Sequence, residues 1–152
     1  MKKIIKKIFL YGFIAFLLLQ FYQPARNTDH GKILPVDITK MHHVPKNIEN
    51  ILQTSCFDCH SNNTNYPWYS YIQPARFILE SDIKNGKEEL NFSEWGNYSE
   101  RKQQSKLDRI EKQIKSGEMP LPMYTLTHKK AILTSTQKDE IYNWINTLKK
   151  DE

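Results

Sequence analysis

The chain has 152 residues, of which 39% are apolar and 26% charged, and its formal net charge is +5. This length suits one domain plus an extension rather than several domains. Lys2, Lys3, Lys6 and Lys7 contribute four of the positive charges, and the other 18 basic residues nearly balance the 17 acidic ones. A nucleic-acid-binding domain would concentrate basic residues on its folded part, so the charge pattern argues against a nucleic-acid partner.

The N-terminal segment has the pattern of a signal anchor. A basic segment at residues 1–7 is followed by the uncharged segment 8–25, which has an apolar centre. A cleaved signal would end with small residues at the first and third positions before the cut, but Gln23 stands two positions before Ala25. We therefore expect residues 8–25 to form an uncleaved transmembrane helix with residues 1–7 in the cytoplasm. The rest would lie on the periplasmic side, as part of a single-pass inner-membrane protein.

Residues 26–44 are expected to be a tether, and residues 45–149 to be the folded domain. The tether contains Gly31, Pro35 and scattered polar residues, which are typical of linkers. Its three histidines are expected to be solvated rather than bound to a metal: His30, His42 and His43.

Four segments of the domain have the apolar spacing of amphipathic helices, which we expect at residues 45–55, 74–85, 99–116 and 136–149. Gly86 and Gly117 follow the second and third segments as stop signals. Thr134 and Gln137 match a capping box before the last segment. Residues 118–124 are expected to be non-helical because two prolines interrupt them. Since no segment alternates as a strand does, the domain is predicted to be all-α.

The five residues Cys56-Phe57-Asp58-Cys59-His60 match Cys-x-x-Cys-His, the attachment motif for a c-type haem. Two thiols three positions apart add to the two vinyl groups of one porphyrin edge, and the next residue becomes an axial ligand of the iron. The motif uses both cysteines of the chain. We therefore expect one covalent haem c on Cys56 and Cys59, with His60 on its iron and the other ring N–H of His60 donated to a backbone carbonyl.

Other sites also use a Cys-x-x-Cys pair. A thioredoxin-like redox pair would need a βαβ pattern, which is absent from this sequence. A zinc site would need a fourth ligand beside Cys56, Cys59 and His60, and His128 or a histidine of the tether would have to supply it. The adjacent His60 and the predicted export favour haem.

Met119 is the expected sixth ligand of the iron. It lies in a Gly-x-Met-Pro segment, where Pro120 restricts the backbone and lets the sulfur be presented with little loss of entropy. Met123 and His128 are alternatives, an open site is another, and ordinary core packing is the commoner role of methionine. Thioether ligation raises the reduction potential relative to two histidines.

Two further groups of residues could contact the haem. Arg76 and Arg101 could pair with its propionates or stay solvated. Four aromatic residues that follow the motif could line the pocket or belong to the general core: Tyr66, Trp68, Tyr69 and Tyr71.

With these motifs in place, the chain resembles the bacterial haem-binding domain family, small exported proteins with a cytochrome c-like domain. The resemblance covers about residues 44–148 and rests on the segments 56–62, 66–69, 91–95, 117–122 and 124–128. It implies covalent haem on Cys56 and Cys59 and an axial His60. By similarity to class I cytochromes c, it also implies that Met119 takes the methionine position and that the first and last domain helices cross.

We therefore predict a membrane-anchored monohaem c-type cytochrome that transfers single electrons on the periplasmic side, with redox proteins and the membrane as partners. No nucleophile–base pair or pair of carboxylates stands out, so we expect an electron carrier rather than an enzyme. Two alternatives remain open. One is the haem subunit of an oxidoreductase or a small peroxidase, and the other is a haem-based sensor or assembly module.

Overall fold

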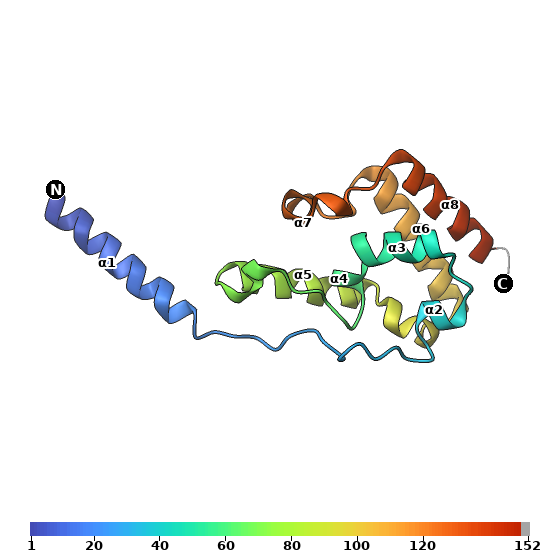
Figure 1. Cartoon of the computed structure of the whole chain (residues 1–152), viewed down its shortest axis with the longest axis horizontal. Coiled ribbons are helices and arrows are strands. Elements are labelled where there is room, and N and C mark those ends of the chain that lie inside the picture. Colours follow the sequence, from blue (N-terminus) through green and yellow to red (C-terminus); the bar gives the residue numbers. More distant parts are fainter. Residues whose placement is uncertain (150–152) are drawn as a thin grey trace.

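A computed structural model of the chain describes residues 1–149, and the regular elements within this range are all helices. The predicted all-α class is therefore confirmed. Helix α1 (Lys2–Leu19) projects away from the other helices (Figure 1). An extended segment then runs along the domain to the short helix α2 (Ile38–Met41).

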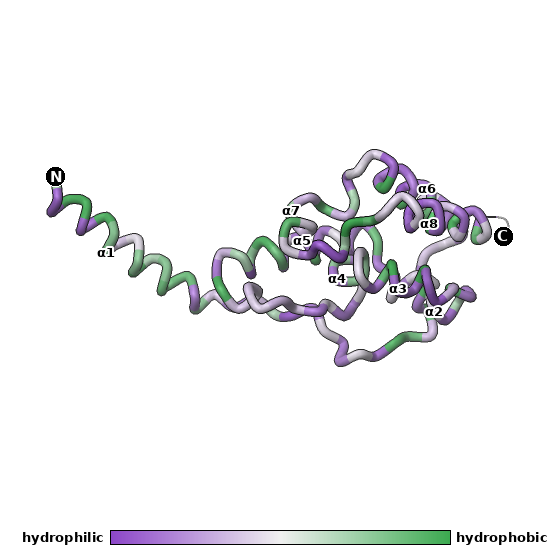
Figure 2. The backbone as a smooth tube through the Cα atoms, turned by 45° about the horizontal axis from the view of Figure 1, so that its top comes forward, coloured by the Kyte–Doolittle hydropathy of each residue, from purple (hydrophilic) through white to green (hydrophobic). Residues whose placement is uncertain are grey.

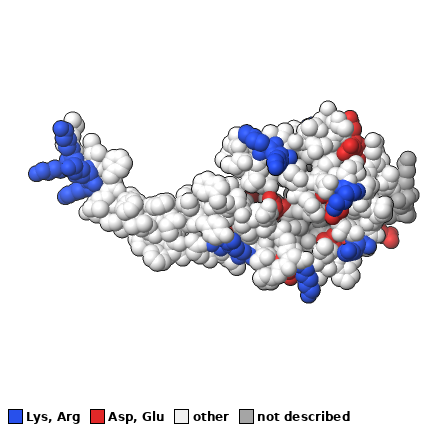
Figure 3. Space-filling model, viewed as in Figure 1, with Lys and Arg blue, Asp and Glu red and all other residues white. Residues whose placement is uncertain are grey.

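The structure does not support the expectation that residues 8–25 form a transmembrane helix. Within residues 1–149, no helix is both long enough and apolar enough to span a membrane. The charged residues of α1 gather at its free end (Figure 3), and the hydrophobic residues follow them (Figure 2). The uncharged part of the helix, from Ile8 to Leu19, is about 18 Å long at ~1.5 Å per residue. The hydrocarbon core of a bilayer is about 30 Å thick.

The domain that follows contains these elements in chain order: α3 (Lys46–Ser55), α4 (Phe57–His60), η1 (Trp68–Tyr71), α5 (Ala75–Glu89), η2 (Phe92–Asn97), α6 (Glu100–Ser116), α7 (Pro122–Thr127), η3 (Lys129–Ala131) and α8 (Ser135–Leu148). Helices α3, α6 and α8 agree with the predicted segments to within a residue at each end. Gly117 ends α6 in the left-handed conformation, with a φ of 77°. The capping box of Thr134 and Gln137 at the start of α8 is confirmed.

Two local expectations were wrong. Gly86 does not stop a helix, because α5 continues through it to Glu89. Helix α7 begins at Pro122, inside the segment that we expected to be non-helical. Proline is well tolerated in the first turn of a helix, where its missing N–H would have no intrahelical partner.

The core lies where α3, α6 and α8 meet and is closed by η2. Helix α8 contacts both α3 and α6, so the first and last helices of the domain, which the resemblance expects to cross, are in contact. The core side chains fall on one face of each helix: Ile48, Ile51 and Leu52 in α3, Leu107 and Ile114 in α6, and Ile141, Trp144, Ile145 and Leu148 in α8. Full burial of such a side chain contributes roughly 1.5–3 kcal/mol.

The segment 26–44, which we expected to be a tether, packs on this domain. Ile38 is fully buried in the core, and the indole N–H of Trp95 donates to Nε2 of His42 over 3.2 Å. The side chain of Asn27 donates to the Ser61 carbonyl over 2.8 Å. This segment therefore packs against the core and against the loop that follows the cysteine motif.

Candidate haem site

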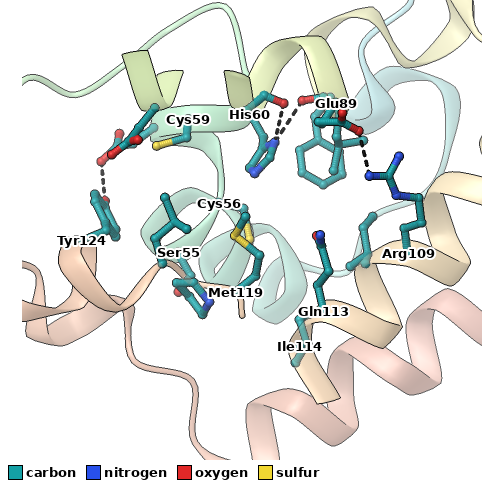
Figure 4. A pocket seen from close by; sticks show the side chains of 18 of the residues that line it. Ser55, Cys56, Cys59, His60, Glu89, Arg109, Gln113, Ile114, Met119 and Tyr124 are labelled. Atoms are coloured by element: carbon teal, nitrogen blue, oxygen red, sulfur yellow. Dashed lines mark hydrogen bonds and ion pairs between the residues drawn. The ribbon is translucent and has the colours of Figure 1, made fainter. Parts of the chain in front are cut away.

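A cavity of about 290 Å³ lies beside the cysteine motif (Figure 4). Its walls come from the motif itself, from α5 and α6, and from the segment that leads into α7. Cys56, Cys59, His60 and Met119 all line it. The fold therefore brings the four residues of the predicted site to one space, although Met119 is 60 positions from Cys59 in the chain.

The two carbonyls that hold His60 decide which of its ring nitrogens is free. Nδ1 lies 2.9 Å from the carbonyl oxygen of Gly86 and 3.0 Å from that of Leu90. A carbonyl can only accept, so Nδ1 carries the proton and donates it, and Nε2 keeps an unshared electron pair. Burial lowers the pKa of His60, against the opposing effect of these two hydrogen bonds, so the ring stays neutral at pH 7. A neutral imidazole with an oriented N–H is the form that binds iron.

Gly86 permits the close approach of α5 that supplies one of those carbonyls. A Cβ atom at this position would lie 2.7 Å from the carbonyl oxygen of Cys59 and 3.2 Å from its Cβ. The glycine is therefore part of the site, because any side chain here would push α5 away from His60. The sequence pattern alone suggested only a helix end.

The two thiols are not in the environment of reactive cysteines. Both are free, and burial raises the pKa of Cys56 and of Cys59 to about 12. The nearby carboxylates of Asp58 and Asp82 add to the effect at Cys59. A catalytic redox thiol needs the thiolate, which this environment disfavours. In the range 1–149, no three His, Cys, Asp or Glu side chains are grouped so as to hold a bare metal ion.

Asp58, a variable position of the motif, links it to two other parts of the chain. The hydroxyl of Tyr124 in α7 donates to one carboxylate oxygen over 2.6 Å, and the backbone N–H of Asn65 donates to the other over 2.9 Å. Burial and the hydrogen bond to this carboxylate raise the pKa of Tyr124, so its hydroxyl stays protonated as a donor. The link holds α7 against the motif, and the segment with Met119 directly precedes α7.

The alternatives for the sixth ligand lie elsewhere. The Met123 side chain is 70% exposed, and it does not line the cavity. The ring of His128 stacks on that of Tyr124 with centroids 4.1 Å apart, outside the cavity lining. Of the three candidates, only Met119 borders the cavity.

The other expected contacts are not part of the cavity lining. The four aromatic residues of the segment 66–71 lie outside it, and Trp68 is 76% exposed. Arg76 is buried, but its guanidinium donates to the side chain of Gln23 and the carbonyl of Pro24. Arg101 is exposed on α6, away from the cavity lining.

Sequence reasoning missed the cationic and polar residues of the cavity wall. Lys106, Arg109 and Gln113 line it from α6, beside Ile110 and Ile114. Their spacing places all five on one face of the helix. The helical spacing of these residues is visible in the sequence, but it does not show that a cavity lies against this face of α6.

A helical domain that directs two thiols and a free imidazole nitrogen into a largely apolar cavity is a small cofactor-binding protein. The haem-binding domain family matches residues 14–147, which is most of the chain. The chain belongs to this family, and haem is accordingly its cofactor. No curated protein and no solved structure matches it.

Proposed function

We propose that the protein is a monohaem c-type cytochrome, with haem held covalently by Cys56 and Cys59, and that it transfers single electrons outside the cytoplasm. The observation that carries this proposal is the meeting of Cys56, Cys59, His60 and Met119 at one apolar cavity. Family membership supports the haem. The attachment, the ligands and the electron transfer are our proposal.

The protein's part in attachment is to present two thiols to one porphyrin edge. Each thiol would add its S–H across one vinyl group, with one C–S and one C–H bond formed, so no external electrons would be needed. The short turn at the motif, in which the N–H of His60 donates to the Cys56 carbonyl over 3.0 Å, keeps the two cysteines and the histidine together. This local geometry favours two bonds to the same haem.

The residues that would ligate the iron would decide what a bound haem can do. Bound haem supplies a one-electron ferric–ferrous couple, and the residues on its two faces set the potential and the access of small molecules. His60 offers Nε2 from the motif, and Met119 offers a soft sulfur from the segment before α7. A site filled on both faces favours electron transfer over a reaction at iron.

The proposed compartment follows from the chemistry of the motif and from the first residues. Thioether attachment takes place outside the cytoplasm, and the basic segment with its uncharged continuation fits an export signal. Redox proteins on the outer side of the cytoplasmic membrane are the partners that this placement implies.

The ligand assignment is tested with Met119→Ala in the haem-loaded chain. We expect the near-infrared charge-transfer band between thioether sulfur and ferric iron to disappear, because no sulfur then faces the iron. Met123→Ala is the matched control and should keep the band, since Met123 is exposed. A band that survives Met119→Ala would contradict the assignment, and a wild-type protein without the band would favour the open site of a peroxidase.

A further inference from the structure

One wall of the cavity carries cationic side chains that take no part in the proposed thiol attachment or iron ligation. On α6, Lys106 and Arg109 line the cavity one turn apart, and Gln113 continues the same face. The rest of the lining is mainly apolar. Three carboxylates also line the cavity: Glu89, which pairs with Arg109, and Asp58 and Asp82, which lie near Cys59. The anionic edge of a ligand is therefore best placed at the cationic wall, away from Cys59.

Lys106 is the unusual member of this group. The residue is only 8% exposed, and its ammonium donates to a backbone carbonyl, that of Glu89 at the end of α5. Its pKa is lowered by burial and then by the neighbouring cations Arg109 and Lys102. No carboxylate within residues 1–149 forms an ion pair with it. The Glu89 carboxylate opposes this lowering, but only from beyond ion-pair distance. A buried charge with so little compensation is costly, so the site favours an incoming anion.

Arg109 can be released for the same ligand at little cost. Its guanidinium lies 2.7 Å from the carboxylate of Glu89, but both side chains are at least half exposed. Surface pairs of this kind contribute about 0–1 kcal/mol. Arg109 could therefore exchange this partner for a carboxylate that arrives within the cavity.

The position of the cations matches the shape of haem. In Figure 4, Arg109 lies across the cavity from Cys59 and Tyr124, with Cys56 between them. Haem carries its vinyl groups at one edge and its two propionate carboxylates at the opposite edge. A haem whose vinyl edge lies at the cysteines turns its carboxylates toward the other side of the cavity.

We propose that Lys106 and Arg109 bind the haem propionates. This inference rests on the proposed covalent attachment at Cys56 and Cys59, because that attachment decides which edge faces α6. The charge-assisted hydrogen bonds would offset the cost of the buried ammonium and hold the edge of haem that the thioethers do not reach.

The test uses the haem-loaded full chain and resonance Raman spectroscopy of the propionate bending modes. We expect Lys106→Met and Arg109→Gln each to shift these modes, because a carboxylate loses a donor. Each should also lower the reduction potential, because a positive charge near the iron favours the ferrous state. The control is Lys102→Met, an exposed lysine over the Tyr98 ring on the same helix, which should leave the modes unchanged.

The possible outcomes separate this inference from the proposed function. If the wild-type protein lacks covalent haem, both fail. If haem is attached and the modes are unchanged in both variants, the propionate assignment alone is wrong. A purely structural role of Lys106 would lower the unfolding midpoint without moving the modes. Should Lys106→Met fail to fold, Arg109→Gln decides the matter, because Arg109 is half exposed.

Discussion

The imidazole of His60 depends on two backbone carbonyls near the end of α5, and so on how closely α5 can approach the motif. Gly86 and Leu90 supply these acceptors at 2.9 Å and 3.0 Å from Nδ1. A hydrogen bond to the second ring nitrogen orients a ligating histidine and raises its basicity. The residues that prepare the iron ligand are thus far from the motif in sequence, and only the fold identifies them.

Gly86→Ala should destabilise the protein. The new methyl group would lie 2.7 Å from the Cys59 carbonyl oxygen, a backbone atom that cannot simply rotate away. We expect a cost of about 1–3 kcal/mol for the crowding, which exceeds the ~1 kcal/mol that alanine gains over glycine in a helix. Denaturant unfolding of the loaded protein measures the difference.

The matched control is Gly12→Ala in α1, where nothing lies within 4 Å of the added Cβ. This variant should be at least as stable as the wild type. Equal stability of the Gly86→Ala and wild-type proteins would mean that α5 does not approach the motif as closely as described.

At the scale of elements, the sequence predicts best those helix features that depend on residues close together in the chain. The spacing of Ile48, Ile51 and Leu52 predicted α3, and the capping residues Thr134 and Gln137 predicted the start of α8, because neighbours along the chain decide both. The sequence predicts a helix end at Gly86, but the role of this glycine is to allow a close contact with another helix. The pattern of residues around Gly86 in the sequence gives no information about that contact.

Thr134→Ala should weaken α8. The Thr134 hydroxyl accepts from the backbone N–H of Gln137 over 3.2 Å, and the side chain of Gln137 accepts from the N–H of Thr134 over 2.9 Å. Loss of such a cap costs about 0.5–2 kcal/mol. The control, Thr136→Ala, changes an exposed residue in the first turn and should cost less than Thr134→Ala. Thermal or denaturant unfolding compares the two, and equal losses would exclude the capping role.

At the scale of the whole molecule, the all-helical class could be predicted from the sequence. One short motif and one Met-Pro segment were enough to propose the four site residues, and the structure places these at one cavity. The cationic wall could not be predicted, because helical spacing shows which residues share a face but not what covers that face. The aromatic residues of 66–71 were misjudged for the opposite reason. Their apolar character suggested the haem pocket or the general core, but Trp68 and Tyr71 are exposed at η1.

The segment before the domain was also judged on composition alone. Its glycine, prolines and polar residues suggested a tether, but Ile38 is buried in the core and Asn27 contacts the loop after the motif. The family match likewise begins at residue 14, well before the expected start of the domain. Long-range contacts of this kind have no periodic pattern in the sequence.

The most direct test of the account is a pyridine haemochrome spectrum of the chain after expression with the c-type haem maturation machinery. We expect the spectrum of a haem with two thioether bonds, and a pigment that stays with the protein in acidified acetone. Cys56→Ala together with Cys59→Ala should abolish both properties. A colourless wild-type protein, or a pigment that acidified acetone extracts, would contradict covalent attachment at these cysteines.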